Sequence, residues 1–400
     1  MLPILNLKPK EQRRLKSGHL WIFRDELIEP TEPLASGSLV RIHTDSGVDM
    51  GIGFYHPTSQ IAVRLLRFLG NDLTEDFFRE RLQTALALRR RLFPVEQSYR
   101  LVFGESDFLP GLIIDRYHDG SHDYFAVQCL SAGMDARIEI ISSALRSVFP
   151  QTAGIIAKND SALRIKEGLQ REEHIVFGTI PDAVHITENG IRLAVSLIAG
   201  QKTGYFLDQR VNRAFIAHIA QDLSVLDCFT NQGGFALNAA KGGARNAVGI
   251  DISASAIARS QENAKINGFT NCSFIKADVF EYLKEQAQKR LAGEIHGWDM
   301  VILDPPAFTK SKANISQAKR GYADINRTAL KLITPGGFLV SSSCSHHISA
   351  DMLYDIIEQE SARANRKLKL IFSGMQSPDH PVYMPMPETR YLKFFVFEVW

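Results

Sequence analysis

The sequence is poor in the features that mark secreted, metal-binding or membrane proteins. It has only four cysteines in 400 residues and no C-x-x-C pair. This scarcity argues against a disulfide framework and a structural zinc site, so we expect no metal. No run approaches ~18 consecutive apolar residues, and the apolar opening MLPILNL is too short for a signal peptide. We therefore expect a reduced, cytoplasmic protein without a membrane partner.

A strong excess of charge is also missing, because the formal net charge is only +2. Any binding of nucleic acid must therefore come from a local patch. One such patch stands in LKPKEQRRLKSGHLWIF, where five cations oppose one acid before a group of aromatic residues. Its cations are Lys8, Lys10, Arg13, Arg14 and Lys16. Phosphate contact with base stacking, or a solvated helix face before a core strand, explains this pattern equally well.

Three segments with different patterns follow one another, as expected for a chain too long for one core. Residues 1–72 contain short strand-like runs and glycine-marked turns. Residues 73–185 combine the amphipathic helix EDFFRERLQTALALRRRLF with the strand-like runs GLIIDRY and YFAVQCL, which indicates a small α+β domain. Residues 186–400 alternate strands with helices. That alternation predicts a parallel sheet covered by helices on both faces.

The functional signals of the last segment stand where its strands end, which is where ligands of such sheets bind. SVLDCF ends near Asp227, NAVGID at Asp251 and CSFIKAD at Asp278. Asp227 leads into a loop of small residues that permits close backbone approach to a ligand. Asp251 can accept both hydroxyls of a ribose, and Asp278 can reach an adenine amine. Since the G-x-G-x-x-G fingerprint is absent, these acids indicate a nucleoside without a diphosphate.

The next two strands end in DPPAF and VSSSCSHH. Two prolines cannot continue a central strand, so they fix a rigid turn that aims Asp304 and Phe308 outwards as a platform for a planar base. If these strands are neighbours, Asp304 and Cys344 share one rim. His346 and His347 beside the cysteine are explained at least as well as structural residues.

Together these runs resemble a known family. VLDCFTNQGGF, GIDIS, ADVF, LDPPAF and SSSCS resemble the motifs of class I S-adenosylmethionine (SAM)-dependent methyltransferases. GQKTGYFLDQR, KSGHLWIF, LPGLIIDRY and SPDHPV…PETRYLK resemble the ribosomal RNA methyltransferases with an N-terminal PUA domain, closest to the large-subunit methyltransferase I type that forms 5-methylcytosine. The resemblance spans essentially the whole chain. It implies an α/β protein with a PUA β-barrel (1–72), a central α+β domain (73–185) and a Rossmann-like methyltransferase domain (186–400).

The resemblance also implies a cofactor, a partner and a set of site residues. SAM is the implied cofactor, and the residues implied to bind it are Phe206, Asp208, Arg210, Asp227, Phe229, Asn231, Gly233, Asp251, Ile252, Asp278, Val279 and Asp304. The implied partner is 23S ribosomal RNA, naked or in a subunit precursor, and a homodimer is allowed. The RNA-binding residues are then Lys10, Arg13, Arg14, Lys16 and Phe308. A turn at Gly204 with Arg210 in an ion pair is the alternative for GQKTGYFLDQR.

The implied chemistry gives Cys344 a role. Carbon 5 of cytosine is a poor nucleophile, and a thiolate that adds to carbon 6 activates it. Cys344 fits this role, while Asp304 would hold ring nitrogen 3 and the exocyclic amine. The site must favour the thiolate, as a neighbouring cation or helix N-terminus would. Many related enzymes have a second cysteine where this chain has Ala307, so the group that removes the carbon 5 proton is unidentified.

Two other functions stay open at this point. DPPAF and FLDQR also resemble enzymes that methylate a guanine ring nitrogen or an exocyclic amine, for which no cysteine nucleophile is needed. An RNA-binding assembly factor with a vestigial cofactor fold is the remoter alternative. The intact acids at the four strand ends argue against it, because RNA binding alone would not require them.

Overall fold

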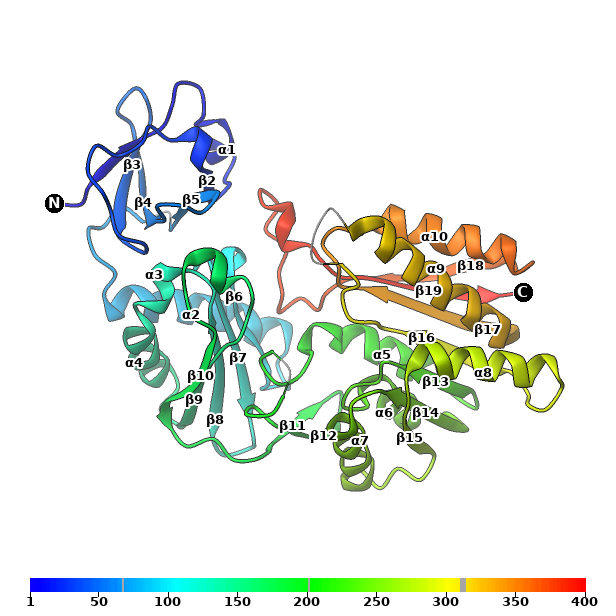
Figure 1. Ribbon diagram of the computed structural model, residues 1–400. Coiled ribbons are helices and arrows are strands. Elements are labelled where there is room, and N and C mark those ends of the chain that lie inside the picture. The colour runs from blue at the N-terminus through cyan, green and yellow to red at the C-terminus, as the bar shows by residue number, and fades with distance from the viewer. Residues whose placement is uncertain (67, 201, 310–313) are drawn as a thin grey trace. The chain divides into compact units, whose positions relative to one another are not determined.

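The computed structural model describes residues 1–66, 68–200, 202–309 and 314–400. The chain forms two compact units (Figure 1). The first contains Met1–Thr187, Val195–Leu207 and Pro378–Thr389, and the second contains Glu188–Ala194, Asp208–Ser377 and Arg390–Trp400. The boundaries expected at 72 and 185 stay predictions. Gln201, the second residue of GQKTGYFLDQR, lies outside the described residues.

The N-terminal part of the first unit is a five-stranded sheet. Its strands, in spatial order, are β1 (Ile4–Asn6), β3 (Leu39–His43), β4 (Asp49–Tyr55), β5 (Ile61–Leu65) and β2 (Trp21–Phe23). They curl around a small apolar core that includes Val40, Ile42 and Val63. A Cβ at Gly53 would lie 2.6 Å from the carbonyl oxygen of Arg64 on β5, so only glycine permits this close strand pairing.

The rest of the first unit is built on a second five-stranded sheet. The spatial order is β10 (Glu172–Gly178), β9 (Thr152–Asn159), β8 (Asp123–Cys129), β7 (Leu112–His118) and β6 (Tyr99–Phe103). Two helices, α2 (Glu75–Leu92) and α4 (Ile138–Val148), pack on each other and on this sheet. Helix α2 begins where the Thr74 side chain accepts the Phe77 N–H. The α+β pattern expected for this segment is present.

The second unit contains the expected parallel sheet. Its seven strands, in spatial order, are β15 (Cys272–Lys276), β14 (Asn246–Asp251), β13 (Ser224–Cys228), β16 (Trp298–Leu303), β17 (Ile333–Ser343), β19 (Lys393–Val399) and β18 (Leu368–Gly374). The first five strands are parallel, whereas β19 is antiparallel to both of its neighbours. The chain order reverses between β13 and β16. Such a switch point is where open α/β sheets bind their ligands.

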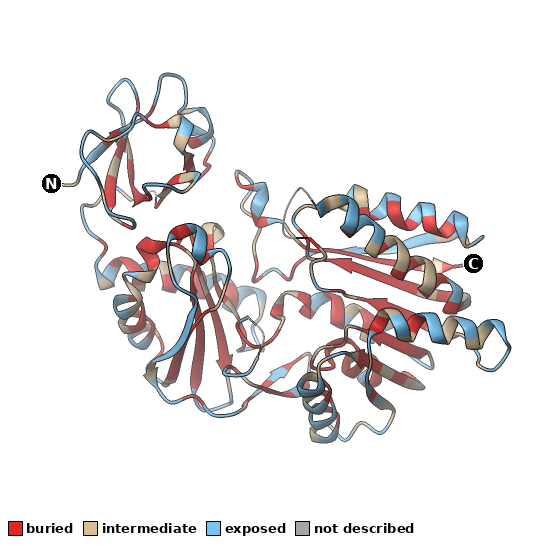
Figure 2. Ribbon diagram, viewed as in Figure 1, coloured by how far each residue is buried: buried red, intermediate tan, exposed pale blue. Residues whose placement is uncertain are grey.

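Six helices flank this sheet in two groups (Figure 1). One group is α5 (Arg210–Ile219), α6 (Gly234–Lys241) and α7 (Ala254–Ile266), and the other is α8 (Val279–Leu291), α9 (Ile315–Leu332) and α10 (Ala350–Arg363). The central strands between them are buried (Figure 2), which accounts for their continuous apolar runs. In the described part of the chain, no helix has the length and apolarity needed to cross a membrane.

Candidate active site

Asp227 is the most deeply buried acid of the site. It lies within β13, which ends at Cys228, so it does not stand at the strand tip as the sequence predicts. Its side chain is fully buried, and its Oδ2 accepts bonds from Thr230 Oγ1 and, at 2.9 Å, from the Ala236 N–H. Oδ1 has no hydrogen-bond partner among the described residues. Burial raises the pKa of Asp227 to about 7.

The loop after β13 holds three residues in the left-handed region. The φ angles are 63° at Phe229, 50° at Asn231 and 85° at Gly233. Gly233 adopts this conformation without steric cost, but the two other residues do so at a cost that surrounding contacts must offset. Backbone of this kind concentrates at ligand-binding sites. The loop therefore has the character expected of a ligand-binding loop.

Asp251 stands at the tip of β14, as predicted. Its Oδ2 accepts the Asn231 N–H at 3.0 Å and its Oδ1 accepts the Ser253 N–H at 2.9 Å. Each carboxylate oxygen keeps a further lone pair for a ligand, so the group is both fixed in orientation and able to accept more bonds. Ile252 beside it is 66% exposed, which leaves an apolar surface next to the acid.

The acid after β15 is placed differently from the prediction. The strand ends at Lys276, and Asp278 is the exposed N-cap of α8, where its Oδ1 accepts the Glu281 N–H at 3.1 Å. The Val279 side chain is buried in the core. At position 279, only the backbone is therefore available to a ligand.

Asp304 follows β16 and is held by side chains from other elements. Gln209 Nε2 donates to Asp304 Oδ1 at 3.0 Å and to Ser342 Oγ at 3.1 Å. Burial raises the pKa of Asp304 to about 6, assisted by the negative charge of Asp208, while hydrogen bonds from the side chains of Ser342 and Gln209 lower it. The acid therefore changes protonation near neutral pH, as a group that exchanges hydrogen bonds with a base would need to do.

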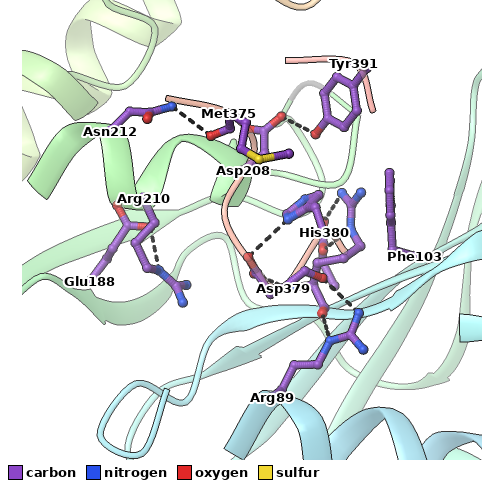
Figure 3. Close-up of polar contacts among 12 residues, drawn as sticks. Arg89, Phe103, Glu188, Asp208, Arg210, Asn212, Met375, Asp379, His380 and Tyr391 are labelled. Atoms are coloured by element: carbon purple, nitrogen blue, oxygen red, sulfur yellow. Dashed lines mark hydrogen bonds and ion pairs between the residues drawn. The ribbon is translucent and has the colours of Figure 1, made fainter. Parts of the chain in front are cut away.

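Two residues of the FLDQR motif are engaged within the second unit, as Figure 3 shows. Asp208 Oδ2 accepts a 2.5 Å hydrogen bond from the Tyr391 hydroxyl. Arg210 is buried, and its Nε lies 3.4 Å from a Glu188 carboxylate oxygen, as the ion-pair alternative expects. Phe206, with Lys202 Nζ 4.9 Å from its ring centroid, belongs to the first unit. The assignment of these three residues to the cofactor stays a prediction.

Cys344 stands on the strand next to Asp304. Strands β16 and β17 are parallel neighbours, so Asp304 and Cys344 lie at the same edge of the sheet, as expected if these strands are adjacent. Their register pairs Leu303 with Ser341, so Ser342 lies opposite Asp304. Cys344 follows two residues later, ~7 Å further along the strand direction. It is a partly exposed cysteine outside any disulfide, in contrast to the buried Cys228.

A buried tyrosine braces the segment around this thiol. The Tyr322 hydroxyl of α9 lies 2.8 Å from Ser343 Oγ and 3.4 Å from Ser345 Oγ, the residues on either side of Cys344. The Tyr322 ring also packs against Phe308, with 4.7 Å between centroids. Phe308 is partly buried against the core, so its use as a base platform stays a prediction.

The cations of the N-terminal patch differ in what they contact. Arg14 pairs with Glu26 at 2.7 Å and lies over the Phe23 ring at 4.5 Å. Lys10, Arg13 and Lys16 are exposed, and their side chains have no ion pair or hydrogen bond among the described residues. These three remain the most accessible cations for a phosphate backbone.

Comparison with known proteins places the chain in a family. Residues 172–395 match the family model of S-adenosylmethionine-dependent methyltransferases, and residues 5–68 match that of PUA-like domains. Ribosomal RNA large subunit methyltransferase I of Alteromonas mediterranea is 36% identical, with 98% of both chains covered. The protein of that name from Klebsiella pneumoniae is 37% identical, with 100% of this chain and 99% of the relative covered. The chain belongs to this family of PUA-domain, SAM-dependent methyltransferases.

A solved structure supports the fold. SMU.776, crystallised in complex with SAH, superposes with a TM-score of 0.83 at 22% identity and covers 100% of both chains. The predicted fold class and SAM as the cofactor are thus confirmed. The site residues fit SAM. Asp251 is fixed and can accept hydrogen bonds from hydroxyl groups, and the unpartnered Oδ1 of Asp227 can accept one from a cationic group. The left-handed loop lies at the same edge of the sheet.

Sequence reasoning missed three side chains of this site. Gln209 holds Asp304, Tyr391 holds Asp208, and Lys393 bonds beside Cys344. All three lie inside runs that the family resemblance singles out, FLDQR and PETRYLK. Residue type alone did not mark them, because their significance comes from which strand ends they join.

Proposed function

We propose that this enzyme transfers a methyl group from SAM to carbon 5 of a cytosine in large-subunit (23S) ribosomal RNA, through a covalent adduct with Cys344. The observation that carries the proposal is the location of a partly exposed thiol and an acid of raised pKa at the ends of adjacent strands. The names of the full-length relatives support ribosomal RNA as the substrate.

Asp251 is the group we assign to the ribose hydroxyls of SAM, since its two oxygens keep free lone pairs. Asp278 and the backbone at Val279 are assigned to the adenine in this proposal, and Ile252 and Phe229 to apolar contact with the cofactor. Asp227, Asn231, Gly233, Phe206, Asp208 and Arg210 are assigned to the remainder of the cofactor. Bound SAM supplies an electrophilic methyl group.

The Cys344 thiolate adds to carbon 6 of cytosine, so that a sulfur–carbon bond forms and carbon 5 becomes nucleophilic. Protonated Asp304 donates a hydrogen bond to ring nitrogen 3 as negative charge develops on the ring. Its pKa of about 6, raised by burial, keeps a fraction of the acid form available near neutral pH. After methyl transfer a base, still unidentified, takes the carbon 5 proton, whose bonding electrons form the 5,6 double bond as the sulfur–carbon bond breaks and the thiolate is regenerated.

The N-terminal domain contributes RNA binding through Lys10, Arg13 and Lys16, with Arg14 as a paired and more weakly available member of the same patch. Each such cation contributes through release of counterions from the phosphate backbone. Phe308 is the base-stacking residue in this proposal.

The direct test measures the product. Wild-type enzyme and Cys344→Ala are incubated with SAM and large-subunit RNA, and the nucleosides are analysed by mass spectrometry. We expect 5-methylcytidine from the wild type and none from the variant. The variant should bind SAM with the affinity of the wild type. A methylated guanosine, or full activity of Cys344→Ala, would instead support methylation of a ring nitrogen or exocyclic amine. Absence of any methylation in every RNA preparation would favour the assembly-factor alternative.

A further inference from the structure

In the part of the chain that the structure describes, buried arginine and lysine side chains are paired with carboxylates, with one exception. Among the described residues, six buried arginine and lysine side chains lie within ion-pair distance of an acid: Arg89 with Asp107, Arg116 with Asp123, Lys158 with Glu173, Arg164 with Asp135, and both Arg210 and Arg213 with Glu188. Lys393 is 9% exposed, and no carboxylate of the described residues lies within 4.0 Å of its Nζ. A buried ammonium is costly without an anionic partner, so this exception needs an explanation.

The backbone places Lys393 beside the thiol. Strand β19 is antiparallel to β17, and their register pairs Lys393 with Ser343, the residue before Cys344. Lys393 Nζ then donates to the carbonyl oxygen of Ser345, the residue after Cys344, at 2.6 Å. A second bond reaches the Tyr391 carbonyl at 2.8 Å. These bonds fix the amine between the carbonyl that directly follows Cys344 and the carbonyl of Tyr391, two residues before Lys393.

Two bonds to carbonyls use two of the three N–H groups that an ammonium carries. Both bonds persist when the lysine is neutral, because a neutral amine still has two N–H donors. The third position is therefore the one that gains or loses a proton. This geometry suits an amine that accepts a proton from a neighbouring acid without giving up its anchoring contacts.

The electrostatic surroundings of Lys393 indicate that its anionic partner is the Cys344 thiolate. Burial lowers the pKa of Lys393 to about 8, while the negative charge of a Cys344 thiolate raises it and the positive charge of Arg390 lowers it. Tyr322 from α9 also interacts with this thiol, because a thiolate at Cys344 and the charge of Asp304 both raise the pKa of Tyr322. His346 and His347 follow Cys344 in the chain. Tyr322 and Asp304 disfavour a thiolate when they are ionised. Lys393 is a cation whose pKa responds directly to charge on Cys344.

We propose that Lys393 is a positioning residue that stabilises the Cys344 thiolate by serving as its buried counter-cation. The S–H bond of Cys344 breaks, its proton forms the third N–H bond of Lys393, and the resulting ammonium and thiolate remain side by side until the sulfur attacks. The electron pair of the S–H bond stays on sulfur, so no other reactant is needed. This inference rests on the proposed role of Cys344 as the nucleophile.

The test measures the acidity of the thiol without RNA or methyl transfer. Iodoacetamide alkylation of the peptide that contains Cys344 is followed by mass spectrometry as a function of pH, in wild type, Lys393→Met, Lys393→Gln and Lys393→Arg. Glutamine keeps donors for the two carbonyls but lacks the charge, so it remains informative if methionine does not fold. Lys369→Met, at an exposed residue of β18 paired with Glu398, is the matched control.

We expect the alkylation midpoint to rise by about one pH unit or more in the uncharged variants, which is a tenfold or greater loss of thiolate at neutral pH. Lys393→Arg and Lys369→Met should stay within a few tenths of a unit of wild type. An unchanged midpoint in folded, SAM-binding Lys393→Gln overturns the inference. If the midpoint shifts but Cys344→Ala still methylates RNA, then Lys393 tunes the thiol as proposed while the cytosine mechanism fails, so the two failures are distinct.

Discussion

Gln209 donates its side-chain amide to the Asp304 carboxylate, with 3.0 Å between Nε2 and Oδ1. Asn212 holds the opposite end of the same amide by donating to Gln209 Oε1 at 2.6 Å. Ser342 Oγ accepts the second Nε2 bond. The Gln209 side chain thus contacts residues of α5, of β17 and of the turn after β16. Gln209 therefore fixes the acid that is proposed to hold the cytosine.

We expect Gln209→Leu to lower the rate constant for methyl transfer by roughly two- to tenfold, because a hydrogen bond to the protonated acid contributes ~0.5–1.5 kcal/mol. The affinity for SAM should change little, since Asp251 and the β13 loop are untouched. Single-turnover methylation with saturating RNA measures the first quantity and calorimetry the second. Equal losses in SAM affinity and rate would show that Gln209 supports the cofactor loop instead.

Binding of SAM should release a proton, about half of one at pH 7 and up to one at lower pH. The pKa of Asp227 in the free protein is raised to about 7 by burial, and SAM brings positive charges that lower it. SAM affinity should therefore rise with pH up to about 7, by at most roughly tenfold per unit, and level off above. Calorimetry in buffers of different ionisation enthalpy detects the released proton. Asp227→Asn should bind with a flat pH profile, and an equally steep profile in that variant would exclude Asp227 as the source.

Asp251→Ala should weaken SAM binding by roughly ten- to hundredfold, because it removes a charged acceptor worth ~1.5–3 kcal/mol from the ribose hydroxyls. RNA affinity should stay at the wild-type value. Equilibrium binding of SAM and of SAH gives both numbers, and the loss should be the same for the two ligands since they share the ribose. Wild-type cofactor affinity in a folded variant contradicts the assignment of Asp251.

Neutralising Lys10, Arg13 and Lys16 together should reduce RNA affinity and its salt dependence. Each lost phosphate contact lowers the slope of log affinity against log salt by ~0.7–0.9, so the triple variant should lose about 2 to 3 units of slope. Lys284, Lys289 and Lys369 of the second unit, each at least partly exposed and paired with a glutamate, form a control set. If both triple variants give the wild-type slope, the N-terminal patch is only a solvated face.

The sequence predicted the sheet and most of the rim because both follow from local patterns. Alternating strands and helices predicted the parallel sheet, and Asp251 at a strand tip followed from the run NAVGID. Asp227 was misplaced by one residue relative to the strand end, and Asp278 turned out to cap α8. Both errors concern element boundaries, where a terminal acid can belong either to a strand or to the next helix.

Contacts between distant segments could not be predicted in the same way. Lys393 lies beside the Cys344 segment because β19 runs antiparallel to β17, and that register is set by packing of the whole sheet. Gln209 likewise contacts Asp304 across 95 positions of sequence. The proposed chemistry predicts a cation near the thiol, but the sequence does not indicate which one. In the structure, Lys393 lies beside this segment.

The central claim, a covalent role for Cys344, is tested most directly by trapping. RNA that carries 5-azacytosine at the target position is incubated with enzyme and SAM, and the mixture is run on a denaturing gel. Nitrogen at position 5 leaves no proton for the release step, so the sulfur–carbon bond should persist. The account predicts a protein–RNA adduct for the wild type and none for Cys344→Ala. An adduct that forms equally well with Cys344→Ala, or methylation of normal RNA by that variant, would contradict it.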